Sequence, residues 1–526
     1  MSLIPEMSDV FNLGAFLLDR HIEEGRSEKV AIICKDNYYT YGEVVDAANR
    51  VGNTLLDLGV EQENRVIICL PDCPELIFSY FGAMRIGAVP VLVSTLASAQ
   101  DYSYYLNDSR AKVLITNSEL APKFSEIRHN LKYLKHFIVS GESADGQLNF
   151  EAMVSKASAF LKIASTSKDD MAFWLYTSGT TGTPKGVVHF HHDLLYLLPP
   201  YCKEVIELGE EDVIFSLSKM YFSYGNNNSI TIPFFGGAAV ILMPELPKPE
   251  KLFEVITKYK PTIFFGVPSS YLAMLNIIEN STIAYDLTSL RICMSSGEAL
   301  PKAIFDRWKE RFGLEILEQL GSTDVGSAYM ATLPGKLKPG SCGLIISGSE
   351  GKLLDDAGKE VRKGEIGTLW LKNDGITPFY WNKHEESKKS IHGEWFNTGD
   401  KFYQDEDDFF WFKGRVDDMM KAGGIWVSPL EVEGILYDHP SVQECAVVGV
   451  PDKANLEKPL AFVVVKEGYN PSPQLEQELQ DFVRSKAAHY KYPRQVFFLN
   501  ELPRTATGKI QRFKLRDRCT SELQSD

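Results

Sequence analysis

Residues 176–186 are the stretch that most constrains what this chain can fold into and bind. They read YTSGTTGTPKG, in which hydroxyl side chains alternate with glycines before a closing Pro-Lys-Gly. The apolar residues 171–176 predict a buried strand that carries this loop to the edge of a sheet. Glycines let the backbone approach a ligand closely, and hydroxyls and a lysine add donors and positive charge, so a polyphosphate site is expected. Its members are Thr177, Ser178, Gly179, Thr180, Thr181, Gly182 and Lys185.

The loop differs from the P-loop pattern G-x-x-x-x-G-K-[ST], because Pro184 precedes the lysine and Gly186 follows it. A flexible loop of serine, threonine and glycine is the simpler explanation of such a run. The Pro-Lys-Gly ending directly after a predicted strand favours the phosphate-binding function.

Short apolar runs alternate with amphipathic segments through the first half of the chain. This alternation predicts an α/β fold, with parallel-type sheets and helices on both faces. Helices are expected at 41–58 and 75–86, each closed by a glycine, Gly59 or Gly87. Strands are expected at 66–70, 88–94, 213–216, 238–243, 262–266 and 291–295.

The pattern changes after residue 340. Short strands separated by Gly and Asp turns predict an antiparallel β subdomain over 340–371. A domain boundary is expected near 414–418. The sequence therefore predicts a large N-terminal α/β domain over 1–415 and a small C-terminal α+β domain over 416–526.

Within the small domain, a helix is expected to begin at Pro429 with Ser428 as its cap. Two apolar strands are expected at 444–450 and 460–466, and a helix at 474–486. The remaining tail is polar and basic.

Composition narrows the functional classes. The net charge of −15 argues against a general nucleic-acid binder, whose binding face would be basic. No apolar run reaches the roughly 18 residues of a membrane span, and the N-terminus lacks the features of a signal peptide. The eight cysteines are scattered without C-x-x-C pairs, which is typical of reduced thiols in the cytoplasm. A cytoplasmic protein is therefore expected.

Four further motifs offer groups that suit a nucleotide. The turn 319–324 combines hydroxyls with the carboxylate of Asp324, which suits a magnesium ion beside a phosphate. Asp400 follows an apolar run and suits the two hydroxyls of a ribose. Arg415 offers a guanidinium to ribose or phosphate, and Lys509 lies in a Gly-flanked turn that suits delivery to a distant site. Each motif alone is equally a helix cap, a turn or part of a basic tail.

Taken in order, these motifs resemble the adenylate-forming superfamily of acyl-CoA synthetases, firefly luciferases and peptide-synthetase adenylation domains. The resemblance runs from about residue 10 to about residue 518 and rests on YTSGTTGTPKG, TGD, GRVDDMMKAGGIWVSPLEVE and PRTATGKIQR together. Within the superfamily the chain is most similar to the benzoate–CoA ligase group. The features behind that likeness are LLDRHIEEGRSEKVAI, the FSYG stretch at 222–225, and GSTD where many relatives carry YGxTE.

The resemblance implies a ligase that joins a carboxylic acid to AMP with ATP and Mg²⁺, then passes the acyl group to CoA. Charge neutralisation dominates such a reaction, because two negative partners must meet. Lys185 would hold the departing phosphates, and Lys509 would bridge the acid and the α-phosphate in the transition state. Asp324 would replace the family's magnesium-binding glutamate with a reach one methylene shorter. The small domain would then swing about Asp417.

Further roles are implied for residues that match the family's motifs. The adenine slot and its neighbouring turn would be formed by Ser296, Gly297, Glu298, Ala299, Gln319, Leu320, Gly321, Ser322 and Thr323. Asp400 and Arg415 would bind the ribose and phosphate. A channel for CoA would be shaped by Lys421, Gly423, Gly424 and Trp426, where the glycines permit close approach of the pantetheine arm.

The acyl pocket is expected among aromatic residues of two segments, 221–225 and 264–268. A short aromatic space suits a flat ring carboxylic acid, although core packing explains the same aromatics. No charged residue lies among them, which argues against a strongly charged acyl substituent. The candidate lining residues are Tyr221, Phe222, Tyr224, Gly225, Phe265, Gly266 and Val325.

Three histidines, His189, His191 and His192, follow the phosphate loop. No carboxylate or thiol set at metal-binding spacing accompanies them. We expect them to serve in packing, in solvent contacts or at the edge of the substrate.

Benzoate or a related ring carboxylate is the leading substrate expectation, with ATP and CoA as the other substrates. Alternatives are cyclohexane- or cyclohexene-carboxylate, or a medium-chain fatty acid, in the ligating or the ATP-forming direction. A carrier-protein thiol could replace CoA as acceptor. A non-catalytic nucleotide-binding regulator is a further alternative, which the presence of both Lys185 and Lys509 disfavours.

Overall fold

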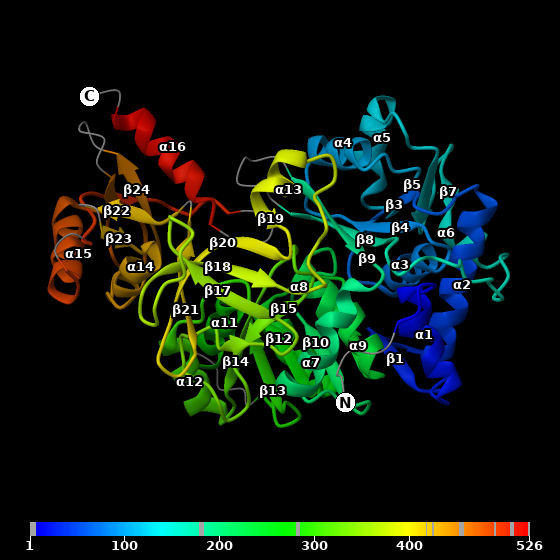
Figure 1. Ribbon diagram of the computed structural model, residues 1–526, viewed down its shortest axis with the longest axis horizontal. Coiled ribbons are helices and arrows are strands. Elements are labelled where there is room, and N and C mark those ends of the chain that lie inside the picture. Colours follow the sequence, from blue (N-terminus) through cyan, green and yellow to red (C-terminus); the bar gives the residue numbers. More distant parts are fainter. Residues whose placement is uncertain are drawn as a thin grey trace. The chain divides into compact units, whose positions relative to one another are not determined.

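The structure of the chain, a computed structural model, contains two compact units (Figure 1). The first unit comprises Met1–Glu350 and Lys372–Phe396, and the second comprises Gly351–Leu371 and Asn397–Asp526. The structure describes residues 7–177, 184–279, 285–416, 418–422, 425–451, 457–488, 491–504 and 510–523.

The larger sheet of the first unit has nine strands in the order β16-β15-β14-β13-β12-β10-β11-β1-β2. The strands from β14 to β1 in this order run parallel, and β2, β15 and β16 are antiparallel to their neighbours. Their bounds are β1 (Val30–Cys34), β2 (Asn37–Thr40), β10 (Val213–Ser216), β11 (Ala239–Leu242), β12 (Ile263–Gly266), β13 (Ile292–Ser295), β14 (Ile316–Gly321), β15 (Ala328–Ala331) and β16 (Leu344–Ile345).

The second sheet of this unit has seven strands in the order β7-β6-β5-β3-β4-β8-β9. All pairs are parallel except the hairpin of β8 and β9, which is antiparallel. This hairpin contains the predicted phosphate loop. The bounds are β3 (Arg65–Cys69), β4 (Val89–Leu92), β5 (Val113–Asn117), β6 (His136–Ser140), β7 (Leu148–Asn149), β8 (Met171–Thr177) and β9 (Lys185–Phe190).

Helices and sheets alternate in five layers. A central layer of α1, α2, α3 and α9 lies between the two sheets and shares one apolar core with both. Helices α10, α11 and α12 cover the outer face of the nine-stranded sheet, and α4 and α5 cover the outer face of the other (Figure 1). The helix bounds are α1 (Leu13–Glu23), α2 (Tyr41–Asp57), α3 (Pro74–Arg85), α4 (Ala99–Asp108), α5 (Ala121–Ile127), α6 (Phe150–Val154), α7 (Leu198–Pro200), α8 (Ser223–Asn226), α9 (Ile232–Gly236), α10 (Pro249–Tyr259), α11 (Pro268–Glu279), α12 (Lys302–Phe312) and α13 (His384–Ser390).

The sequences of α2 and α3 explain their places in the central layer. Thr40 and Glu43 form a capping box at the start of α2, with each side chain accepting a hydrogen bond from the other residue's backbone N–H. The chain leaves α2 through Gly59 and α3 through Gly87, both at positive φ as the sequence predicts. Helix α3 is buried along its whole length except for Glu75, because nearly all its residues are apolar or small and Arg85 at its end pairs with Asp19.

Among its described residues, the second unit combines three sheets with three helices. Strands β17, β18 and β20 are neighbours in that order, β21 also pairs with β20, and β22 and β23 form a separate hairpin. The start of β20, which belongs to the first unit, forms a short hairpin there with β19. A separate sheet of β24, β25 and β26 is covered by α14 and α15 on one face and by α16 on the other. The bounds are β17 (Glu350–Leu354), β18 (Gly367–Lys372), β19 (Ile391–His392), β20 (Trp395–Gln404), β21 (Phe410–Arg415), β22 (Met420–Ala422), β23 (Ile425–Val427), α14 (Pro429–Tyr437), β24 (Val442–Pro451), β25 (Glu457–Val465), α15 (Pro473–Lys486), β26 (Val496–Phe498) and α16 (Arg512–Leu523).

The predicted α/β architecture is confirmed, and each predicted strand of the first half is present. Two details differ. Strand β16 joins the nine-stranded sheet, whereas β17 and β18 lie in a separate sheet. Helix α14 begins at Pro429 with Ser428 at its N-cap position, as predicted, but the Ser428 hydroxyl donates to the Lys413 carbonyl oxygen and makes no capping bond. The basic tail, for which the sequence predicts no element, contains helix α16, whose buried residues Leu515 and Cys519 form an apolar stripe too short to recognise in the sequence.

Among the described residues, no helix is long and apolar enough to cross a membrane. The predicted functional boundary between residues 415 and 416 stays a prediction.

The buried ion pair of Glu433 and Arg512 generates a stability prediction for the second unit. Both carboxylate oxygens of Glu433 accept from Arg512 Nη2, at 2.7 and 2.8 Å, and one also accepts from Val447 N at 2.7 Å. Burial raises the pKa of Glu433, so the carboxylate depends on this partner. Replacing Arg512 by Met should destabilise the unit by about 3–5 kcal/mol, since a buried charge loses its partner.

Urea unfolding monitored by circular dichroism would measure the change. Arg484→Met is the matched control, because Arg484 pairs with the exposed Asp481 and such surface pairs contribute about 1 kcal/mol or less. Equal losses in the two variants would contradict the prediction.

Candidate functional site

The candidate site of the first unit lies at the carboxyl ends of its parallel strands. The phosphate loop follows β8, residues 296–299 follow β13, and residues 322–325 follow β14. The acyl candidates follow β10 or end β12. In open α/β sheets this edge is where ligands bind, because the loops after neighbouring strands converge there.

The base of the phosphate loop is a regular hairpin in which Thr177 and Lys185 are cross-strand partners. Its stems are fixed from outside: Tyr104 OH donates to the Pro184 carbonyl oxygen at 2.8 Å, and Tyr176 OH donates to Asp108 Oδ2 at 2.8 Å. The predicted members Ser178, Gly179, Thr180, Thr181 and Gly182 lie outside the described residues.

A further segment of the first unit, residues 377–381, runs beside β9 and completes this base. Tyr380 bridges to Val187, and Trp381 N donates to the Gly186 carbonyl oxygen at 2.9 Å. The Trp381 indole donates to the Asp108 carbonyl oxygen at 2.8 Å. Sequence reasoning missed this segment, because nothing local in it marks a pairing with a strand nearly two hundred positions earlier.

Tyr380 connects two residues predicted to serve the nucleotide. Its hydroxyl donates to Asp324 Oδ1 at 2.5 Å, and the Lys185 ammonium lies 4.0 Å from the centre of its ring. A cation at this distance from a ring face is attracted by the ring's quadrupole. The structure thus brings Lys185 and Asp324 together around one side chain.

The turn that contains Asp324 is held by its backbone. The Thr323 carbonyl oxygen accepts from His189 Nε2 at 2.7 Å, and the Asp324 carbonyl oxygen accepts from Thr377 N at 2.7 Å. Asn227 Nδ2 donates to the Gly326 carbonyl oxygen at 2.6 Å, which ties the turn to the segment after α8. Gly326 has φ +79°, and an added Cβ would lie 3.0 Å from the His189 ring.

The three histidines are engaged by protein groups. His189 Nδ1 lies 3.0 Å from Asp193 Oδ2, so its two nitrogens face Asp193 and Thr323. His191 Nδ1 accepts from Leu13 N at 3.0 Å, and burial lowers the pKa of His191 to about 3. His192 lies within ion-pair distance of Asp193. These contacts agree with the expected packing role, and they show that His189 also supports the Asp324 turn.

The predicted adenine slot follows β13 and β14. Gly297 has φ +90°, which favours glycine, and residues 297–299 are exposed. Tyr201 OH donates to Gln319 Oε1 and fixes that side chain. Glu318, which sequence reasoning missed, accepts from Leu300 N at 2.8 Å and so ties the end of this loop to β14.

Some of the acyl candidates contact one another. Tyr224 OH donates to the Gly266 carbonyl oxygen at 3.2 Å, and its ring meets Phe265 edge-on at 6.0 Å. Tyr221 and Phe222 contact each other edge-on at 4.7 Å. Val325 is fully buried, as a lining or core residue would be.

Gly225 is required by close packing. An added Cβ would lie 2.1 Å from the Lys219 carbonyl oxygen, which is buried backbone. The group also borders three consecutive buried asparagines, Asn226, Asn227 and Asn228, that sequence reasoning did not single out. The run of three asparagines directly beside the acyl candidates is a signal that the sequence alone could have provided.

In the second unit, Asp400 on β20 and Arg415 on β21 are cross-strand partners. Arg415 Nη1 lies 3.0 Å from Asp400 Oδ1 and donates to the Thr398 carbonyl oxygen at 3.2 Å. Gly399, between Thr398 and Asp400 in the TGD motif, has φ +69°. The two residues predicted to bind the ribose thus lie together.

The remaining predictions fall mostly outside what the structure describes. Lys421 and Trp426 are cross-strand partners in the β22–β23 hairpin. Four residues with predicted roles lie outside the described residues: the predicted hinge Asp417, the two glycines of the predicted CoA loop, Gly423 and Gly424, and the predicted catalytic lysine, Lys509.

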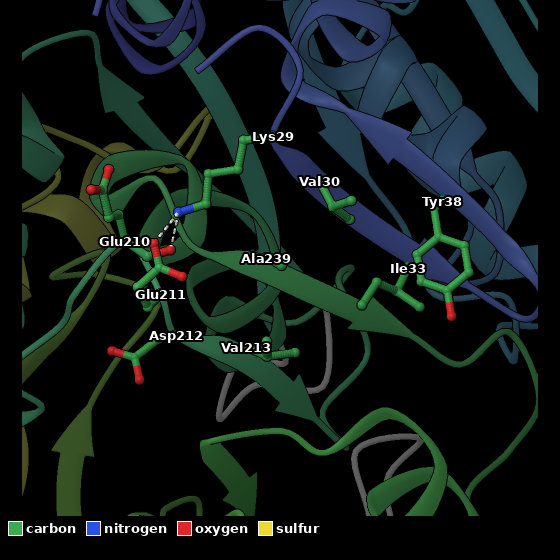
Figure 2. A pocket seen from close by; sticks show the side chains of 9 residues that line it. All are labelled: Lys29, Val30, Ile33, Tyr38, Glu210, Glu211, Asp212, Val213 and Ala239. Atoms are coloured by element: carbon green, nitrogen blue, oxygen red, sulfur yellow. Dashed lines mark hydrogen bonds and ion pairs between the residues drawn. The ribbon is translucent and has the colours of Figure 1, made fainter. Parts of the chain in front are cut away.

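A pocket of about 200 Å³ lies elsewhere in the first unit (Figure 2). Val30, Val213 and Ala239 line it, and these residues begin or immediately adjoin the starts of β1, β10 and β11. It therefore opens at the amino ends of the strands, opposite the candidate site. Lys29 at its rim donates to the Glu210 carbonyl oxygen.

The fold and this site define a nucleotide-binding enzyme of the adenylate-forming class, and comparison with known proteins identifies the family. The profile of the AMP-binding enzyme family matches residues 18–381, and that of the AMP-binding enzyme C-terminal domain matches residues 431–509. The chain belongs to the AMP-binding enzyme family.

The relatives of the chain show which group within the family it is most similar to. The benzoate–CoA ligase of Thauera aromatica is 38% identical over 515 residues, which cover 98% of this chain and 96% of that protein. The 4-hydroxybenzoate–CoA/benzoate–CoA ligase of Rhodopseudomonas palustris is 37% identical, over 96% of this chain and 94% of that protein. The crystal structure of an anthranilate CoA ligase in complex with anthranoyl-AMP superposes with a TM-score of 0.92 at 39% identity, covering 99% of this chain and 100% of that one.

Glu318 generates a prediction for the pH dependence of stability. Burial raises the pKa of its carboxyl from 4.5 to about 8. As pH rises between these values, the unfolded chain releases the proton and the folded chain keeps it, so stability falls. The decline should be on the order of 4 kcal/mol. Glu318→Gln should remove it while keeping an acceptor for Leu300 N.

Urea midpoints measured at about pH 5 and about pH 8 would check this, since the window of the effect lies between the two pKa values. Glu310→Gln, at an exposed position of α12, is the control. The same decline with pH in wild type and Glu318→Gln would refute it.

Proposed function

We propose that this chain activates a benzoate-like ring carboxylic acid with ATP to an acyl-adenylate and transfers the acyl group to CoA, releasing AMP and pyrophosphate. The observation that carries the proposal is the grouping of Lys185, Tyr380 and Asp324 at the base of the phosphate loop. A fixed cation and a fixed carboxylate side by side suit a magnesium–polyphosphate.

A carboxylate is a poor acyl donor, because its leaving group would be oxide. ATP solves this by supplying AMP as a leaving group. Repulsion between the acid and the triphosphate is the main barrier to their meeting, so positive charge at the phosphates lowers it. We assign Lys185 to the departing pyrophosphate and Lys509 to the bond-forming carboxylate and α-phosphate.

Magnesium fits the donor set around Asp324. Mg²⁺ takes one or two carboxylates and completes its shell with phosphate oxygens and water. The structure offers one carboxylate here, and one of its oxygens already accepts from Tyr380. We therefore propose that Asp324 holds the ion together with the phosphates of ATP, where the ion would neutralise their charge.

The other nucleotide and CoA roles are proposals from the family pattern. We assign the adenine to residues 296–299 and 319–323, the ribose to Asp400 and Arg415, and CoA to the 421–426 loop. A large domain over 1–415 and a small domain over 416–526 that turns at Asp417 would alternate between the two half-reactions. The proposed compartment is the cytoplasm, in keeping with the eight free cysteines.

The aromatic group around Tyr224 and Phe265 supports a ring acid, and the relatives named above act on benzoate or hydroxybenzoate. The proposed pocket has no charged member, so an uncharged ring fits it best.

A panel of acids tests the substrate proposal. Pyrophosphate exchange should be fastest with benzoate or a singly substituted benzoate. Cyclohexanecarboxylate and octanoate should be slower by at least tenfold, a difference of about 1.4 kcal/mol in transition-state binding. Exchange confined to acyl chains of about eight carbons or more would overturn the ring-acid proposal. Supplying CoA to the purified chain should yield a thioester, and its absence would favour a carrier-protein acceptor.

Lys509→Ala tests the proposal that Lys509 serves the adenylate-forming half-reaction and not thioester formation. It should reduce adenylate formation by at least about a hundredfold, because one transition-state charge contact is lost. Thioester formation from supplied acyl-adenylate should change little. Single-turnover measurement of each half-reaction would distinguish the two, and equal loss of both would contradict the assignment.

A further inference from the structure

We propose that Tyr380 is a positioning residue that presents Asp324 to the metal and Lys185 to the phosphates. This inference rests on the proposed function, in which Asp324 holds Mg²⁺. It assigns a role to a side chain that matched no motif.

The side-chain contacts of Tyr380 reach both groups. Its hydroxyl is the donor to Asp324 Oδ1, because a carboxylate only accepts, and the 2.5 Å separation is typical of a charge-assisted bond. Its ring lies 4.0 Å from Lys185 Nζ. Tyr380 itself is 3% exposed, whereas Asp324 and Lys185 are partly exposed, so a buried phenol presents both groups toward solvent-accessible space.

The backbone around Tyr380 is fixed on three sides. Tyr380 N donates to Ser387 Oγ at 3.0 Å, and Tyr380 bridges to Val187 on β9. Three residues before it, Thr377 Oγ1 donates to the Val188 carbonyl oxygen at 2.7 Å, and Thr377 N donates to the Asp324 carbonyl oxygen at 2.7 Å. One short segment therefore sets the position of both the loop base and the carboxylate turn.

The placement of Tyr380 keeps the opposite charges of Lys185 and Asp324 close together without pairing them directly. A lysine and an aspartate that both serve a magnesium–polyphosphate must lie close together, yet direct pairing would neutralise both. Among the described residues, no ion pair joins Lys185 to Asp324. The phenol occupies one oxygen of Asp324 and leaves the other for the metal, and the ring face attracts the ammonium without neutralising it.

Two substitutions separate the two contacts. Tyr380→Phe removes the hydroxyl and keeps the ring, so the Mg²⁺ concentration for half-maximal pyrophosphate exchange should rise about tenfold. Binding of metal-free ATP should stay unchanged. Tyr380→Leu removes the ring as well, so it should also weaken metal-free ATP binding by about threefold.

The decisive measurement is a double-mutant cycle with Asp324→Asn. Calorimetry would give the affinity for ATP with Mg²⁺ and with a chelator, and pyrophosphate exchange would give the metal dependence. Tyr259→Phe is the control, because it removes a phenol hydrogen bond, to the Lys35 carbonyl oxygen, that involves none of the candidate site residues. Thermal unfolding reports the integrity of each variant. If Tyr380→Leu fails to fold, the isosteric Tyr380→Phe carries the test alone.

The outcomes distinguish the inference from the proposed function. A tenfold shift in Tyr380→Phe that disappears in the Asp324→Asn background supports the positioning role. A shift in Asp324→Asn without one in Tyr380→Phe, or an equal shift in both backgrounds, overturns that role alone. No change of metal dependence in Asp324→Asn overturns the proposed metal site, and the inference with it.

Discussion

The pairing of residues 380–381 with β9 is the contact on which the candidate site of the first unit depends. A phosphate loop needs a rigid base, and an edge hairpin is the least supported part of a sheet. Here Tyr380 bridges to Val187 and Trp381 donates to Gly186, so the edge is occupied. The same segment then reaches the turn after β14 through Thr377. Loop base and carboxylate turn, which belong to different sheets, are thereby held at a fixed spacing.

The sequence predicts what is local. Apolar runs and glycine stops locate β10 and α2 nearly to the residue, because periodicity and turn chemistry act over a few positions. The motifs predict Lys185, Asp324, Asp400 and Arg415 as site residues, and these roles stay predictions. Tyr380 escapes prediction because its partner Asp324 is 56 positions away. His189 and Glu318 escape for the same reason: their functions depend on backbone groups of distant loops.

Several buried ionisable groups of the first unit are either made neutral by burial or paired with an opposite charge, as Lys219 is with Asp72 and Arg85 with Asp19. Burial makes Glu318 neutral over most of the pH range and His191 neutral above about pH 3. His189 Nδ1 and Asp193 Oδ2 face each other at 3.0 Å. Lys185 and Asp324 lie at the carboxyl edge of the strands, where the proposed polyphosphate and its metal would need a cation and a carboxylate. When neutral groups surround a few fixed charges, the electric field of those charges stays available to act on the ligand.

The central helical layer has a consequence for how this enzyme can be divided. Helix α3 is buried almost entirely and contributes to a core that both sheets share. The two sheets are therefore halves of one folding unit, since both bury the face that points to the central helices in the same apolar core. A fragment that ends after the seven-stranded sheet would expose α1, α2 and α3 to water. Recombination between relatives should accordingly tolerate exchange of surface loops far better than exchange of either sheet.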